Sequence, residues 1–202
     1  MPEYEPHYPR FDVMREEENW DPHTREIVTK RLKNESFYPY RYLTQHEGDT
    51  LFRLCAILLD DARSPVLAYV VFHFDSTLQA GIGEAQRKIG VPKQSELIRD
   101  GLALLDQVCT ERHGNRFISM EESDQRRFVG QLVRGEIGLS SGGRQVPVRE
   151  WINKILTEAV AAYYSHPSIW SEIGYAGPAY PRGYVRSELG LTDPWEARRD
   201  GK

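Results

Sequence analysis

The stretch "TQHEGDTLFRLCAILLDD" (residues 44–61) carries both a helix start signal and an apolar helix face. Thr44 is followed three residues later by Glu47, which predicts a capping box in which each side chain satisfies a backbone N–H of the other residue. The apolar residues that follow recur at spacings of three and four, the period of one helix face: Leu51, Leu54, Cys55 and Leu58. We therefore expect an amphipathic helix packed against a core.

Further helices are indicated on both sides of this stretch. Asp21 followed by Pro22 predicts a short helix near the N-terminus, since aspartate caps helices and proline suits the first helical position. Ser119 and Glu122 have the spacing of a second capping box. Other helices are expected to begin at Ser64-Pro65, Lys93 and Val146.

The segment that begins at Ser64 is β-branched and aromatic in its first half, so a buried strand is an alternative there. Its length and its lack of turn residues before Gly81 favour a helix. We find no convincing strand pair, and the Gly/Ser-rich connection 135–145 predicts a flexible surface loop. The expected fold class is all-α, a single bundle-like domain of about five to six helices around one core.

Aromatic residues and prolines concentrate at the two ends of the chain. Eight of the 22 aromatic residues lie in residues 1–42 and seven in residues 163–202. We expect an N-terminal arm with a short helix (1–43), a helical core domain (44–165) and an extended C-terminal arm (166–202). Because aromatic rings need burial, the arms should dock on a surface. That surface belongs either to a partner protein or to the chain's own helices.

The C-terminal arm contains the most distinctive stretch, "YYSHPSIWSEIGYAGPAYPRGYVR" (163–186). Its glycines and prolines predict neither helix nor regular strand, with Pro167 ending the preceding helix and the glycines letting the backbone bend. Aromatic and arginine side chains dominate the energetics of protein interfaces. The candidate partner-binding residues are Tyr163, Tyr164, Pro167, Trp170, Gly174, Tyr175, Gly177, Pro178, Tyr180, Arg182, Gly183 and Tyr184.

Motifs for catalysis, cofactors or metals are missing from the sequence. It has no Glu-x-x-His pair for a di-metal bundle, no P-loop and no Gly-x-Ser-x-Gly. His73 and Asp75 are two residues apart, so they lie on different faces of a helix. Cys55 and Cys109 sit in apolar helical patterns and are expected to be buried thiols. We therefore expect no catalytic, cofactor-binding or metal-binding residue in this chain.

Charge and hydropathy narrow the possible partners and compartments. The net charge of −4 shows no basic excess for binding nucleic acid. The longest apolar runs, "LCAILL" and "LAYVVF", are far shorter than the roughly 20 residues of a membrane span. No apolar signal segment opens the chain. We expect a cytoplasmic protein, or a periplasmic one if the sequence is a trimmed mature form or a partner carries the export signal.

The order of these segments resembles the gluconate 2-dehydrogenase subunit 3 family. The resemblance runs over about residues 44–186 and includes "FDSTL", "IRDGLALLDQVC" and "RFISMEESDQRRFV". Its most specific part is the end of the last long helix followed by "IGYAGPAYPRGY", which is similar to the family's pattern of glycines, prolines and tyrosines.

The resemblance implies a small, cofactor-free subunit of a flavin-dependent sugar or polyol dehydrogenase. The implied partner is a large FAD-containing subunit of the glucose–methanol–choline type, in some complexes joined by a cytochrome c. The small subunit would assist the folding, stability and export of that partner. Two alternatives from other classes are a stand-alone helical adaptor that binds an unrelated protein, and a helical enzyme with an unrecognised site.

Overall fold

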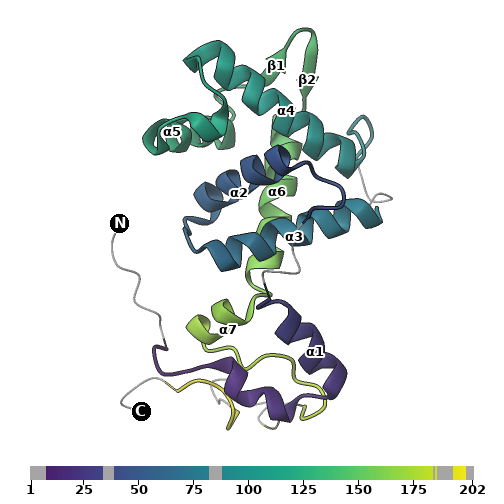
Figure 1. Cartoon of the computed structure of the whole chain (residues 1–202), viewed down its shortest axis with the longest axis vertical. Helices are drawn as coiled ribbons and strands as arrows, with labels where there is room; N and C mark the ends of the chain where they lie inside the picture. The colour runs from purple at the N-terminus through teal and green to yellow at the C-terminus, as the bar shows by residue number, and fades with distance from the viewer. Residues whose placement is uncertain (1–7, 34–38, 82–87, 184, 186–192, 199–202) are drawn as a thin grey trace. The chain divides into compact units, whose positions relative to one another are not determined.

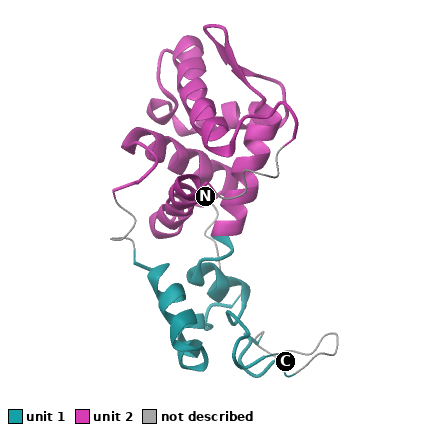
Figure 2. Cartoon of the chain, turned by 90° about the vertical axis from the view of Figure 1, so that its right-hand side faces the viewer, with its two compact units in different colours: residues 1–36, 163–202 teal, residues 37–162 magenta. Residues whose placement is uncertain are grey.

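The structure is a computed structural model that describes residues 8–33, 39–81, 88–183, 185 and 193–198. The chain divides into two compact units, which Figure 2 colours separately. One, here called the core unit, spans residues 37–162. The other, the arm unit, combines residues 1–36 with residues 163–202. The two ends of the chain, which the sequence suggested as separate arms, therefore share one unit.

The core unit is helical, as Figure 1 shows. Its long helices are α2 (Gln45–Leu59), α3 (Ser64–Ala80), α4 (Gln94–His113), α5 (Glu122–Val133) and α6 (Val148–Tyr163), the last residue of which begins the arm unit. Between them lie a 3₁₀ turn, η3 (Phe117–Ser119), and a small hairpin of β1 (Leu139–Ser141) and β2 (Arg144–Val146). The all-α fold class predicted from the sequence is confirmed, with this two-stranded sheet as an addition.

Helix α2 is built as its sequence predicts. Thr44 Oγ1 accepts a hydrogen bond from the Glu47 N–H at 3.2 Å, and the Glu47 carboxylate accepts one from the Thr44 N–H at 2.7 Å. Leu51, Leu54 and Cys55 are fully buried. The segment from Ser64 is also helical rather than extended. Helix α3 contacts both α2 and α4, so its apolar residues are buried on more than one side.

Helices α4 and α6 approach each other closely at a glycine. A Cβ on Gly101 of α4 would lie 2.0 Å from Nε1 of Trp151 on α6, so only glycine leaves room for this indole. Trp151 is fully buried, and its Nε1–H points to the Ile98 carbonyl at 3.4 Å. The contact therefore fixes where α6 crosses α4.

The segment before α2 is tied to the core by a buried carboxylate. Asp75 of α3 accepts hydrogen bonds of 2.7–2.8 Å from three successive backbone N–H groups, those of Arg41, Tyr42 and Leu43. Arg99 of α4 adds a bond of 2.6 Å to the Tyr42 carbonyl, and its guanidinium lies 4.2 Å from the centre of the Tyr42 ring. Asp75, the carboxylate of the "FDSTL" segment, thus anchors the chain that leads into α2.

The prediction of a flexible loop over residues 135–145 is wrong. Strands β1 and β2 pair antiparallel with Leu139 opposite Val146. Gly142 and Gly143 form the two-residue turn with φ values of 56° and 78°, the left-handed region that such hairpin turns require. Leu139 and Val146 are buried, and the hairpin packs against α4. A pair of buried apolar residues and a Gly-Gly turn are enough to order this segment.

The capping box predicted at Ser119 and Glu122 is also wrong. Ser119 ends the 3₁₀ turn, and α5 starts only at Glu122, with Glu121 at the N-cap and no side-chain capping bond. Buried Gln125 explains the shift, because its amide donates to the Phe117 carbonyl at 2.7 Å and holds the turn against the helix.

In the described residues of the arm unit lie the short helical elements η1 (Val13–Asn19), α1 (Pro22–Lys30) and α7 (Pro167–Ile173). Asp21 caps α1 through the His23 and Thr24 N–H groups, as its sequence predicts. The prediction that nothing after residue 165 is helical is wrong for α7. Pro167 does not close α6, which ends at Tyr163, but occupies the first turn of α7, where its missing N–H costs no hydrogen bond.

Candidate partner-binding surface

The arm unit has a hydrophobic centre built from both ends of the chain. Val13, Trp20 and Val28 from the N-terminal arm pack with Trp170 from α7, and Phe11 and Met14 cover this cluster. The Val13 N–H donates to Ser171 Oγ at 3.1 Å, which joins η1 to α7. The two arms are therefore packed on each other.

Trp170 organises the surface around this centre. It is only 5% exposed, and its Nε1–H donates to the Tyr164 carbonyl at 2.5 Å. The Tyr175 ring packs edge-on against the indole at a centroid distance of 5.4 Å, and the Arg31 guanidinium lies 5.5 Å from the centre of the indole. Arg31 also donates to the Ser165 carbonyl at 2.7 Å. One buried tryptophan thus holds two tyrosines and an arginine in place.

Several large side chains of the arm unit stay in contact with solvent. Tyr164 is 52% exposed, Tyr175 39% and Tyr180 70%. Ile27 and Ile173 of the same unit are exposed as well. Tyrosines held rigidly in solvent lose little entropy on binding, which is why such residues are enriched at protein interfaces. Tyr164, Tyr175 and Arg31 all contact Trp170, and we call these three residues the tyrosine surface.

Two glycines of the C-terminal arm are places where the N-terminal arm comes close. A Cβ on Gly177 would lie 2.6 Å from Cζ2 of Trp20. A Cβ on Gly174 would lie 2.6 Å from Cε2 of Tyr8 and 2.8 Å from Cβ of Ala197. Both glycines also have φ above +70°, which other residues rarely adopt. The glycines of "IGYAGP" therefore serve packing as well as bending.

Arg182 joins the two arms through its charge. Its side chain is 9% exposed and donates to the Ala176 carbonyl at 2.5 Å. Its Nη1 lies 3.6 Å from the Glu16 carboxylate, and its guanidinium lies 4.8 Å from the centre of the Trp195 ring. Burial lowers the pKa of Arg182, while Glu16 acts in the opposite direction. The arginine that the sequence suggested as an interface residue is thus largely enclosed within the arm unit.

The remaining candidate residues from the sequence fall into different environments. Tyr163 is half-buried and packs edge-on against Tyr164 at 5.3 Å, Pro167 is buried, and Pro178 is half-buried. Gly183 has φ of 70° and lies in the open. Tyr184 lies outside the described residues. The structure brings Tyr164, Trp170 and Tyr175 together.

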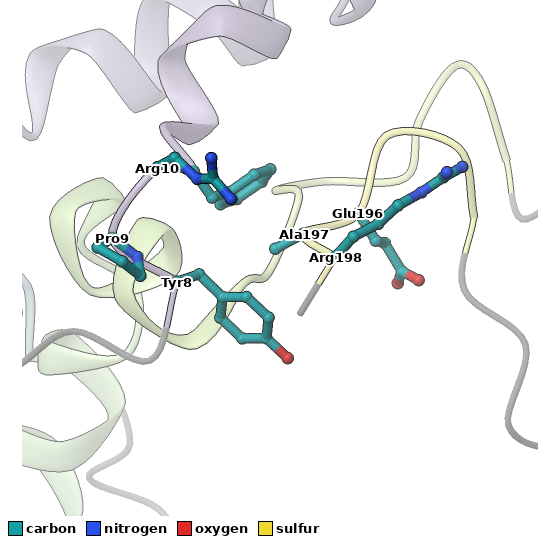
Figure 3. A pocket seen from close by; sticks show the side chains of 7 residues that line it. Tyr8, Pro9, Arg10, Glu196, Ala197 and Arg198 are labelled. Atoms are coloured by element: carbon teal, nitrogen blue, oxygen red, sulfur yellow. The ribbon is translucent and has the colours of Figure 1, made fainter. Parts of the chain in front are cut away.

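Sequence reasoning missed the contributions of the N-terminal arm, namely Tyr8, Trp20 and Arg31. Its excess of aromatic residues was visible, but nothing local in the sequence showed which residues those rings would contact. The arms also line an open surface pocket of about 180 Å³, to which Phe11 contributes. Figure 3 shows Tyr8, Pro9 and Arg10 on one side of it and Glu196, Ala197 and Arg198 on the other. We call this the seam pocket.

Polar clusters in the core unit have structural roles. Glu158 of α6 contacts His73 of α3 at 3.7 Å and Lys154 at 2.9 Å, and its interactions with these two side chains, the hydrogen bond of His73 foremost, lower its pKa to about 2. His46 of α2 contacts Asp106 of α4, which also accepts the Phe117 N–H at 3.0 Å. Burial raises the pKa of the Cys55 and Cys109 thiols to about 12, which leaves them unreactive.

A comparison with known families matches residues 45–177 to the family described as gluconate 2-dehydrogenase subunit 3. The match covers well over half of the sequence. The chain belongs to this family. The matched region runs from α2 to the Gly177 that meets Trp20, so the N-terminal arm lies outside it. Comparisons with curated proteins and with solved structures give no match.

The family is named as a subunit of a dehydrogenase. Over the part of the chain that the structure describes, no helix is long and apolar enough to cross a membrane. Within those same residues, no group of three or more His, Cys, Asp or Glu side chains is placed to hold a metal ion.

Proposed function

We propose that this chain is a non-catalytic accessory subunit that binds and stabilises the large FAD-containing subunit of a sugar or sugar-acid dehydrogenase. That partner would be of the glucose–methanol–choline type and would carry the flavin and the catalytic residues. A cytochrome c subunit is a further expected member of the complex. In this proposal the small subunit contributes a rigid binding surface that supports the folding and assembly of its partner.

The observation that carries the proposal is the tyrosine surface, seen together with membership in a family of dehydrogenase subunits. Two exposed tyrosines and an arginine contact a buried tryptophan, which holds them in place. Binding hot spots are enriched in such residues and are rigid before binding. Trp170 itself is buried, so we assign it the role of positioning its exposed neighbours.

The test is an affinity measurement with a flavin-containing dehydrogenase subunit of the proposed type, co-expressed with this chain. We expect Tyr164→Ala and Tyr175→Ala each to weaken binding by more than about 1 kcal/mol, a loss typical of interface aromatic residues. The variants should keep the helical circular dichroism of the parent, because both side chains are exposed.

Val133→Ala is the matched control, because Val133 is an exposed apolar residue of the core unit, at the end of α5. The proposal requires this variant to bind as the parent does. If Val133→Ala weakens binding while both tyrosine variants bind normally, the contact lies in the core unit and the tyrosine surface is not the interface. If the parent chain binds an unrelated protein but not the flavoprotein, the chain is an adaptor.

A further inference from the structure

The N-terminal arm covers the C-terminal motif that the family shares. Trp20 lies on Gly177 and Tyr8 lies on Gly174, each so close that a methyl group would clash. The backbone of Val13 is bound to Ser171, 158 residues further along the chain. The matched family region ends at Gly177 and begins only at residue 45, so these covering residues come from outside it. The C-terminal motif is therefore packed beneath residues of the N-terminal arm.

The seam pocket is a place where one ligand group can touch both arms at once. Four of its lining residues come from the N-terminal arm and three from the C-terminal arm. Figure 3 shows the two sets on opposite sides of the pocket. Phe11, Pro9 and Ala197 supply apolar lining, and Arg10 and Arg198 supply positive charge. The Glu196 carboxylate already accepts the Asp193 N–H at 2.8 Å.

We infer that the dehydrogenase's large subunit inserts an apolar side chain, next to a carboxylate, into the seam pocket, and so binds this chain only when its two arms are paired. This inference rests on the proposed function. The volume of about 180 Å³ suits a single side chain rather than a helix or a cofactor. Guanidinium groups pair most strongly with carboxylates, which makes an acidic residue the complementary neighbour of that side chain. Arg198 is exposed and within reach of a partner.

Coupling between the arms and the partner follows from this geometry. A ligand that contacts both arms binds the paired state and draws the equilibrium toward it. A change that separates the arms lowers the fraction of chains able to bind, and the apparent affinity falls by that fraction. By reciprocity, the bound partner must shift the equilibrium between separated and paired arms toward pairing. During its synthesis, the chain would also be able to bind the large subunit only after its C-terminal residues have been added.

The experiment compares four full-length proteins. They are the parent chain and its single variants Trp20→Ala, Arg198→Glu and Arg15→Glu. Hydrogen exchange of each chain alone reports arm pairing, and titration with the flavin-containing subunit reports affinity. Trp20→Ala should speed exchange over residues 163–183 and weaken binding about tenfold or more. Arg198→Glu should leave exchange unchanged and still weaken binding about tenfold. Arg15→Glu is the control, since it reverses an exposed charge of the N-terminal arm outside the seam pocket. It should change neither the exchange nor the affinity.

Two results would overturn the inference while leaving the proposed function intact. One is a Trp20→Ala chain whose arms exchange faster but which binds as the parent does. The other is an Arg198→Glu chain that binds as Arg15→Glu does. If the parent itself fails to bind the flavin-containing subunit, the proposed function and this inference both fail. The exchange data on the chain alone then still report whether the two arms are paired.

Discussion

Single residues explain why particular positions of this chain tolerate little change. Gly101 makes room for the Trp151 indole, and Gly177 makes room for Trp20. Asp75 satisfies three backbone N–H groups that have no helix or strand to pair with. None of these roles could be assigned from the sequence, because each depends on a residue distant in the chain. The sequence showed only that these residues were present, in predicted helices for Gly101, Trp151 and Asp75 and in the arms for Gly177 and Trp20.

Gly101→Ala should destabilise the core unit by about 3 kcal/mol, since the new methyl group would force the buried indole out of place. Gly130→Ala is the matched control in α5, because its Cβ would meet only the flexible end of Arg134 at 3.1 Å. That substitution should stabilise the chain by up to about 1 kcal/mol through helix propensity. Urea unfolding measures both. Equal effects of the two variants would contradict the assigned role of Gly101.

Glu158 gives a prediction for pH. Its pKa falls from 4.5 to about 2 in the folded chain because His73 and Lys154 favour the carboxylate. A carboxyl whose folded pKa is depressed contributes stability that is complete above its unfolded pKa and is lost as the pH falls through its folded pKa. Glu158→Gln should therefore be less stable than the parent at neutral pH, by about 1 kcal/mol after solvent screening.

The difference between parent and Glu158→Gln should stay constant down to about pH 4.5 and shrink as the pH approaches 2. Thermal unfolding of both chains over this pH range measures it. A difference that is the same at pH 7 and pH 2.5 would show that the ion pairs are not its source.

At the scale of elements, helices with a local start signal were predictable, whereas the hairpin and α7 were not. The capping box of α2 and the Asp21-Pro22 start of α1 depend on neighbouring residues, which the sequence displays directly. The hairpin strands have three residues each, too few to show an alternating pattern. Helix α7 has seven residues among prolines and glycines, and its stability comes from the packing of Trp170 against the other arm.

The hairpin can be tested at its turn. Gly143 has φ of 78°, a conformation that costs a β-branched residue about 1–2 kcal/mol. Gly143→Val should therefore destabilise the chain by that amount, while Gly143→Asn, which tolerates this region, should cost much less. Thermal unfolding compares the two. Identical losses for valine and asparagine would mean that this turn does not order the segment.

At the scale of the whole molecule, the chain separates a helical core unit from an arm unit assembled from its two ends. The exposure of Tyr164, Tyr175 and Tyr180 fits the aromatic enrichment that the sequence shows at the C-terminal end. The pairing of the arms was not predictable, since contacting residues such as Val13 and Ser171 lie 158 positions apart and share no local pattern. Family membership adds a dehydrogenase complex as the setting for this surface.

The most direct test of the account is sedimentation of the flavin-containing subunit, followed by its flavin absorbance, with and without this chain. The account predicts that the purified chain alone has no flavin absorbance. It also predicts that adding the chain makes the flavin sediment faster, as a complex of the two subunits. A flavin boundary that does not move on addition of the folded chain, or flavin carried by the chain itself, would contradict the account.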